Sequence, residues 1–214
     1  MIPASVLDPL VARVEALVPT AAARVVVGIA GMPGAGKSTL AEELVRALAG
    51  GQEWRDTRVA YLPMDGFHLA DAELRRLGRA DRKGAPDTFD VDGYAALLAR
   101  VAAGETVWAP GFERTLEQPI AQSLPITANT QIVITEGNYL LLPDPAWRRV
   151  RAHLTEAWYV QLADETRLRR LTWRHVEFGK TPKAAREWVR RSDEANAALI
   201  GPTGSTADLL IDLG

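Results

Sequence analysis

The chain has 214 residues and a formal net charge of -2 at pH 7, with 47% hydrophobic residues and no cysteine. This length suits one globular domain, so we expect a single domain over residues 1–214. The near-neutral charge argues against a nucleic-acid-binding surface, and the lack of cysteine excludes disulfides and thiolate zinc sites. The first residues lack the basic segment of a signal peptide, and no apolar run is long enough to span a bilayer. Together these features predict a cytoplasmic protein with no membrane or nucleic-acid partner.

The first part of the chain predicts a helix, a strand and a second helix. Apolar residues at helical spacing indicate a helix over residues 5–18, which Pro19 closes. An apolar, β-branched run indicates a strand over residues 24–30. A glycine-rich segment then leads into a helix over residues 37–49. This order is typical of an α/β fold.

The glycine-rich segment, residues 31–38, matches the pattern G-x-x-x-x-G-K-[ST] between a strand and a helix. Glycines let the backbone approach an anion, and the amide N–H groups at a helix N-terminus point toward it. In this pattern Lys37 reaches the β- and γ-phosphates and the Ser38 hydroxyl binds Mg²⁺. The alternative is a glycine-rich turn in another α/β fold. We favour a nucleoside triphosphate site made of Gly31, Met32, Pro33, Gly34, Ala35, Gly36, Lys37, Ser38 and Thr39.

A candidate catalytic carboxylate follows the next predicted strand, residues 58–62. Ligands bind beyond the carboxyl ends of strands in open α/β sheets, and Asp65 comes at such an end. The alternative is an ordinary turn, because Asp-Gly is a common turn signal. His68 is a candidate substrate contact, whereas His153 and His175 are interpreted as structural.

The middle of the chain gives weaker signals. Residues 71–90 are charged and irregular, which predicts either a solvated loop or a flap whose cations, Arg82 among them, face anionic oxygens of a substrate. Asp92 is expected to cap a helix over residues 93–103. Residues 107–114 predict a loop or a short extended piece, followed by polar, proline-containing sequence.

The second half returns to alternating strands and helices. A buried strand over residues 131–135 ends at Glu136, where an acidic residue can approach Mg²⁺ in phosphate-loop enzymes. Further patterns predict a strand over 156–162, a helix over 182–199 and a final strand over 207–211. The alternation predicts a parallel sheet.

Arg167, Arg170 and Arg174 lie at i, i+3 and i+7 of a helix that Asp164 is expected to cap, so they share one face. One interpretation is a solvated basic face. The other is an arginine cluster that stabilises the charge of a transferring phosphoryl group.

These motifs together resemble the phosphoribulokinase / uridine kinase / bacterial pantothenate kinase family. They look most like its nucleoside/nucleotide kinase-like, or fructose transport system kinase-like, subgroup. The resemblance rests on residues 31–38, 64–68, 82–90, 135–139 and 166–170, in the family's order. It implies an α/β P-loop NTPase fold, with a central parallel sheet flanked by helices and a helical lid around residues 164–182.

The resemblance also implies roles for individual residues. Asp65 would accept or orient the substrate hydroxyl, Glu136 would lie near Mg²⁺ and substrate, and the arginines would cover the phosphates. Asn196 matches a position near the ligand in pantothenate kinases. The predicted catalytic residues are Asp65, Lys37 and Arg170, and the nucleotide site gains Arg167, Arg170 and Arg174. The predicted substrate contacts are Asp65, His68, Arg82, Glu136 and Asn196, and the predicted metal ligands are Ser38, Asp65 and Glu136.

The resemblance implies an ATP- and Mg²⁺-dependent kinase that phosphorylates a free hydroxyl of a small molecule. A nucleoside is the first candidate, and pantothenate and a fructose-type sugar are the alternatives. A P-loop ATPase or nucleotide-binding regulator without an acceptor is the alternative of another class. Uridine kinases usually carry Ser and Tyr where this chain has Gly66 and His68. Members of the family are often dimers or tetramers, so a homodimer stays open.

Overall fold

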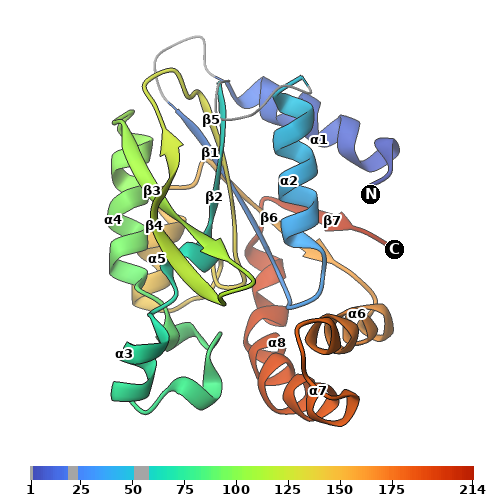
Figure 1. The fold of residues 1–214 in the computed structure, drawn as a ribbon. Helices are drawn as coiled ribbons and strands as arrows, with labels where there is room; N and C mark the ends of the chain where they lie inside the picture. Colours follow the sequence, from blue (N-terminus) through green and yellow to red (C-terminus); the bar gives the residue numbers. More distant parts are fainter. Residues whose placement is uncertain (1, 19–23, 51–57) are drawn as a thin grey trace.

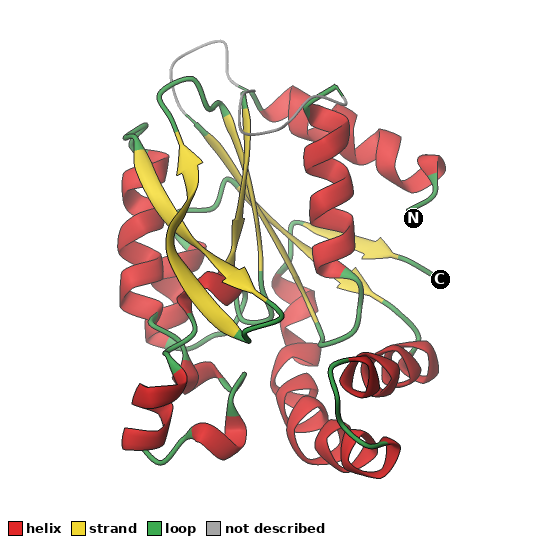
Figure 2. Ribbon diagram, in the orientation of Figure 1, coloured by secondary structure: helices red, strands yellow, loops and turns green. Residues whose placement is uncertain are grey.

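The computed structural model describes residues 2–18, 24–50 and 58–214, and helices cover both faces of its main sheet (Figures 1 and 2). The predicted end of the first helix at Pro19 lies outside these residues. The strands of the sheet are all parallel, in the order β2-β5-β1-β6-β7. They are β1 (Val25–Gly31), β2 (Val59–Pro63), β5 (Ile132–Glu136), β6 (Glu156–Gln161) and β7 (Leu209–Asp212). The predicted α/β class with a central parallel sheet is therefore confirmed.

The helices connect these strands and pack on either face of the sheet. In chain order they are α1 (Ala4–Leu17), α2 (Lys37–Leu48), α3 (Asp71–Arg76), α4 (Val91–Ala102), α5 (Pro145–Arg151), α6 (Asp164–Glu177), α7 (Pro182–Trp188) and α8 (Glu194–Ile200). Val25, Val27 and Ile29 of β1 pack in one core with α1 and α2, and Val26 and Ala30 pack in the other with α4 and α5. Burial of both faces explains why β1 is apolar throughout.

The segment 71–90, predicted to be irregular, contains α3 and two short 3-10 turns, Ala80–Arg82 and Pro86–Thr88. The predicted cap of the next helix is also wrong by two residues. Asp90 has the non-helical backbone of a cap, and its Oδ1 accepts the N–H of Gly93 at 2.8 Å. Asp92 lies inside the first turn of α4, so its carboxylate cannot cap the helix.

Residues 107–126 form an antiparallel hairpin, β3 (Val107–Glu113) and β4 (Gln118–Ile126). A loop or a short extended piece was predicted over 107–114, and no strand was predicted over the rest of the hairpin. This hairpin is a sheet of its own, which tolerates prolines in its strands better than a central strand would. Its tip reaches toward the carboxyl edge of the main sheet (Figure 1).

The predicted helix 182–199 is interrupted by a π turn, Val189–Asp193, between α7 and α8. A π turn holds an extra residue and shifts the inward face of the following helix. Ala195, predicted to face inward, is exposed for this reason, whereas Asp193 and Asn196 are buried.

At the amino end of β1, the buried Arg24 forms a clamp between separate segments. Its guanidinium donates hydrogen bonds to the backbone oxygens of Val101, Gly104, Glu105, Thr127 and Thr130, at 2.8 to 3.3 Å. Val101 lies in the last turn of α4, and the other four acceptors lie in the segments that follow α4 and β4, so these bonds tie the two segments together.

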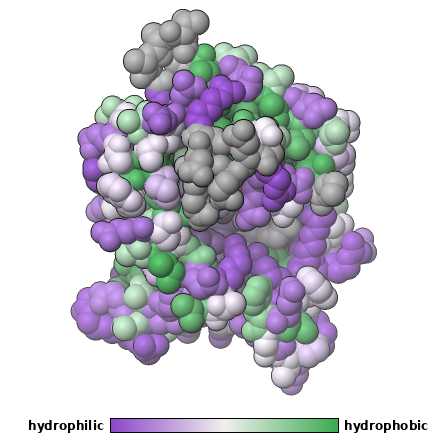
Figure 3. Space-filling model, turned by 45° about the horizontal axis from the view of Figure 1, so that its top comes forward, coloured by the Kyte–Doolittle hydropathy of each residue, from purple (hydrophilic) through white to green (hydrophobic). Residues whose placement is uncertain are grey.

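Hydrophilic side chains predominate on the face drawn in Figure 3, with hydrophobic ones scattered among them. Within the described ranges, none of the helices combines the length and the apolar character that a bilayer crossing requires.

Candidate active site

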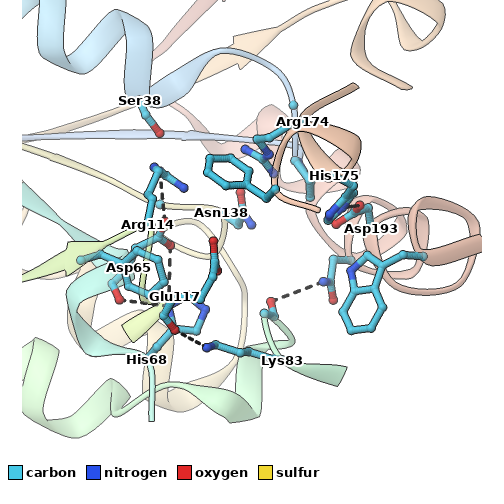
Figure 4. A pocket seen from close by; sticks show the side chains of 18 of the residues that line it. Ser38, Asp65, His68, Lys83, Arg114, Glu117, Asn138, Arg174, His175 and Asp193 are labelled. Carbon is cyan, nitrogen blue, oxygen red and sulfur yellow. Dashed lines mark hydrogen bonds and ion pairs between the residues drawn. The ribbon is translucent and has the colours of Figure 1, made fainter. Parts of the chain in front are cut away.

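A pocket of about 480 Å³ lies at the carboxyl edge of the main sheet. Its walls come from four parts of the chain: the glycine-rich loop after β1, the segments after β2 and β5, the tip of the β3–β4 hairpin, and helices α6 to α8. Figure 4 shows side chains from these parts pointing into the same space. This is the edge of an open α/β sheet where ligands bind.

The glycine-rich loop has the geometry of an anion cradle. Gly34 and Gly36 have φ angles of 80° and 97°, which favour glycine. A Cβ at Gly34 would also lie 2.7 Å from Cγ of Leu171 and 2.9 Å from the Arg167 carbonyl oxygen. Gly36 caps α2 without a side-chain hydrogen bond, so the amides of the first turn stay open to an anion.

Lys37 begins α2, is buried, and donates from Nζ to the Met32 carbonyl oxygen at 3.1 Å. Burial lowers the pKa of Lys37 to about 8, and Arg174 acts in the same direction, whereas Glu136 opposes both. A buried ammonium with one carbonyl partner among the described residues gains stability when an anion binds beside it.

Asp65 and Glu136 enter the pocket from neighbouring strands. Glu136 ends β5 in register with Pro63, the last residue of β2, and Asp65 follows two residues later in a 3-10 turn. The Tyr61 hydroxyl donates to Oε1 of Glu136 at 3.2 Å. Burial raises the pKa of Glu136, and the charge of Asp65 adds to this effect. Two carboxylates therefore face a buried ammonium.

Ser38, Asp65 and Glu136, predicted to bind Mg²⁺, all line this pocket. In the part of the chain that the structure describes, no three His, Cys, Asp or Glu side chains gather as a metal cluster. Mg²⁺ usually takes one or two carboxylates and completes its coordination with water and substrate phosphates. One hydroxyl and two carboxylates beside a phosphate loop fit that requirement.

His68 lies in the pocket wall against the rings of Phe89 and Phe112, with centroids 4.0 and 5.2 Å away. Its Nδ1 is 2.9 Å from the backbone oxygen of Asp65, and a carbonyl oxygen only accepts, so Nδ1 carries the proton. Burial lowers the pKa of His68. The neutral ring therefore offers Nε2 as an acceptor.

Arg82, predicted to contact substrate, lies outside the pocket lining. Its guanidinium pairs with the Asp87 carboxylate at 2.7 Å on the exposed side of the segment. Lys83 lines the pocket instead, and its Nζ pairs with Oδ1 of Asp71 at 2.7 Å. The 3-10 turn directs adjacent cations to opposite sides, which the sequence alone did not indicate.

The three arginines of α6 do not share one open face. Arg167 is 1% exposed and donates to Glu194 at 2.6 Å, to Asp164 at 3.0 Å and to the Pro33 carbonyl oxygen at 3.3 Å. Its donors thus join α6 to α8 and to the glycine-rich loop, and its role over the phosphates stays a prediction.

Arg170 and Arg174 are exposed, but they lie in different places. Arg174 lines the pocket. Arg170 is not among the lining residues; its Nη1 is 3.6 Å from the place where a Cβ on Gly36 would stand, so it lies beside the glycine-rich loop.

Several pocket residues had no predicted role. Arg114, at the hairpin tip, has its Nη2 3.6 Å from Oδ2 of Asp65. His175, interpreted as structural, lines the pocket and pairs with Asp193 of the π turn at 2.8 Å. Asn196, in contrast, was predicted to contact substrate, and it lines the pocket, where its Nδ2 donates to the Gly84 carbonyl oxygen at 3.3 Å. Burial alternates along residues 107–113 in the folded chain, but the sequence there does not alternate apolar and polar residues, and no local pattern places the tip beside Asp65.

A phosphate-binding loop with a buried lysine, facing two carboxylates at the edge of a parallel sheet, defines a P-loop kinase. The chain belongs to the phosphoribulokinase / uridine kinase family, whose model matches residues 26–214. The family predicted from the motifs is thereby confirmed.

Individual relatives agree with this assignment. A candidate uridine kinase of Schizosaccharomyces pombe is 31% identical over 196 residues, which cover 88% of this chain and 83% of that protein. A pantothenate kinase of Limosilactobacillus reuteri is 33% identical over 150 residues, covering 64% and 48%. The crystal structure of a candidate fructose transport system kinase from Silicibacter sp. TM1040 gives a TM-score of 0.85 at 34% identity, covering 95% of this chain and 98% of that chain.

Proposed function

We propose that the protein transfers the γ-phosphoryl group of ATP to a hydroxyl of a small cytoplasmic metabolite, with Mg²⁺ bound. The observation that carries this proposal is that Asp65 and Lys37 line one pocket from different elements. A phosphate-binding ammonium and an acceptor-binding carboxylate on facing walls leave room for a substrate hydroxyl between them.

In the proposed reaction, Asp65 accepts the hydroxyl proton as the hydroxyl oxygen bonds to the γ-phosphorus. The bond from that phosphorus to the bridging oxygen breaks, and ADP leaves with the bonding electron pair. The loop amides and Lys37 hold the phosphates, while Ser38 and Glu136 hold Mg²⁺. His68 offers Nε2 to the acceptor.

A nucleoside is the acceptor class that we place first. Phe112, Phe178 and Trp188 line the pocket, and aromatic faces can stack on a planar base. The fission yeast relative carries a uridine kinase name. Pantothenate and a fructose-type sugar stay as alternatives because the other two relatives carry those names.

The test is a coupled ADP-release screen over nucleosides, pantothenate and free sugars, with the Asp65→Asn variant beside the parent. We expect one acceptor class, nucleosides first, to raise ADP release in the parent and not in the variant. ADP release that no acceptor changes would indicate an ATPase. Nucleotide binding without any ADP release would indicate a regulator.

A further inference from the structure

The guanidinium of Arg114 lies in the pocket without a hydrogen bond to any described residue. Its ion pair with Asp65 spans 3.6 Å, and its side chain is 45% exposed. A guanidinium has five N–H donors in a planar fork that matches the oxygens of a carboxylate or phosphoryl group. The donors of Arg167, in contrast, are bound to protein oxygens.

The hairpin tip that carries Arg114 is anchored to the acceptor side of the pocket. Nζ of Lys83 donates to the Glu117 carbonyl oxygen, and the Asp71 N–H donates to Oε1 of Gln118 at 3.3 Å. Arg114 also has its Cζ 6.0 Å from the centre of the Phe112 ring. The two hydrogen bonds fix the hairpin tip from which Arg114 projects, so the backbone of this segment does not have to be ordered when a substrate binds.

Arg114 acts on both walls of the pocket. Figure 4 shows its guanidinium between Ser38 of the phosphate loop and Asp65. Burial lowers the pKa of Lys37, and the charge of Arg114 acts in the same direction; burial raises the pKa of Glu136, and the charge of Arg114 opposes that rise. Arg174 lowers the pKa of Lys37 too. Lys37, Arg174 and Arg114 thus bring three positive charges around one space, from α2, α6 and the hairpin.

We propose that Arg114 is a catalytic residue whose guanidinium donates hydrogen bonds to the phosphoryl oxygens as the group passes to the acceptor. The inference rests on the proposed function. In phosphoryl transfer, negative charge spreads over three equatorial oxygens, and an arginine stabilises it. Arg114 is suited to this because its donors form no hydrogen bond with the described residues and Asp65, which takes the hydroxyl proton, is its neighbour at 3.6 Å.

The first test compares Arg114→Ala, Arg114→Lys and the parent in steady-state kinetics. We expect the kcat of Arg114→Ala to fall about 100- to 1,000-fold with little change in the KM for ATP, as for loss of a transition-state donor. Arg114→Lys keeps the charge without the fork and should lie between the two. Added guanidinium ion should restore part of the activity of Arg114→Ala, which a purely structural role would not allow.

The matched control is Arg100→Ala, which removes an exposed arginine paired with Glu105 away from the pocket. It should behave as the parent. An unchanged kcat in Arg114→Ala would overturn the proposal. A loss confined to the KM of the acceptor would also overturn it, because Arg114 would then recognise the acceptor and not the phosphoryl group.

A second test needs no acceptor. The parent should bind ADP, Mg²⁺ and aluminium fluoride, which imitate the transferring group, at least about 100-fold more tightly than ADP and Mg²⁺. Arg114→Ala should bind ADP as the parent does and lose most of this gain. The same gain in parent and variant, or none in the parent, would contradict the proposal. If no acceptor in the kinase screen raised ADP release but aluminium fluoride still tightened ADP binding in the parent and not in Arg114→Ala, only the proposed function would be contradicted.

Discussion

Arg24 and Arg114 lie at opposite ends of the main sheet and show two uses of the same side chain. Arg24 gives its donors to carbonyl oxygens at the amino end of β1, and within the described residues it has no carboxylate partner. Arg114, at the carboxyl edge, has donors with no hydrogen bond in the described chain and a carboxylate 3.6 Å away. The first arginine joins segments of the fold, and the second is available to a ligand.

The difference follows from the cost of leaving polar groups unpaired. Arg24 is 7% exposed, so each unpaired donor there would lose its hydration without compensation. The half-exposed Arg114 keeps water as a partner until a ligand replaces it. Of these two arginines, the one whose donors point into a pocket is the better candidate for ligand binding, whereas the buried one has a structural role.

The largest effect is expected from Lys37→Ala, which removes the ammonium of the phosphate loop. Acceptor-dependent ADP release should be abolished and the affinity for ATP should fall, because the phosphates lose the buried ammonium at the start of α2. Calorimetric titration with ATP and the coupled assay measure both. If Lys37→Ala kept the turnover of the parent, the phosphate loop would not be the site that binds the triphosphate.

Asp65→Asn should come next, with a kcat about 100-fold or more below that of the parent, because the amide cannot accept the hydroxyl proton. ATP affinity should stay unchanged, since the P-loop is intact. Measuring kcat and ATP affinity in the same variant separates the role of Asp65 in the reaction from the role of the phosphate loop in binding. If kcat stayed at the parent's level, another residue would have to be the base.

Arg24→Met tests the other end of the sheet. Buried carbonyl oxygens would lose their donors, so the free energy of unfolding should fall by about 2–3 kcal/mol. Urea denaturation measures the change, with Arg100→Met as the exposed control. ADP affinity of the folded variant should equal that of the parent. If Arg24→Met had the stability of the parent but bound ADP more weakly, the amino and carboxyl edges of the sheet would not be independent.

The smallest effect concerns pH. The pKa of Lys37 is about 8 in the free protein because of burial, so its ammonium is present below pH 8 and is lost above it. A bound triphosphate favours the charged form, and ATP affinity should therefore fall about tenfold between pH 7 and pH 9. Titration calorimetry across this range checks the slope. Constant affinity would mean that Lys37 stays charged throughout.

The sequence predicted the parts of the fold that depend on local pattern. The strands of the main sheet are short apolar runs, and the phosphate loop is a fixed motif, so residues 31–38 and Glu136 could be placed at one edge of the sheet. The hairpin was missed because its prolines, such as Pro110 and Pro119, oppose a strand assignment that only the separate two-stranded sheet permits.

The parts that failed depend on tertiary contacts. Helical spacing grouped Arg167 with Arg174, but packing of α6 on the phosphate loop buries Arg167 against Glu194. The π turn brings Asp193 into the pocket beside Asn196, which the family resemblance had placed near the ligand; helix periodicity alone assumes that no such turn occurs. Arg114 reaches Asp65 across 49 positions of sequence, a distance at which no local pattern operates.

The central claim is that Asp65 and the phosphate loop act on one hydroxyl from facing walls. Its most direct test is a crystal structure with Mg²⁺, a non-hydrolysable ATP analogue and the acceptor found in the screen. We expect the acceptor hydroxyl to donate to the Asp65 carboxylate and to face the γ-phosphorus in line with the bridging oxygen. A carboxylate of Asp65 directed away from the bound hydroxyl, with another group in its place, would contradict the account.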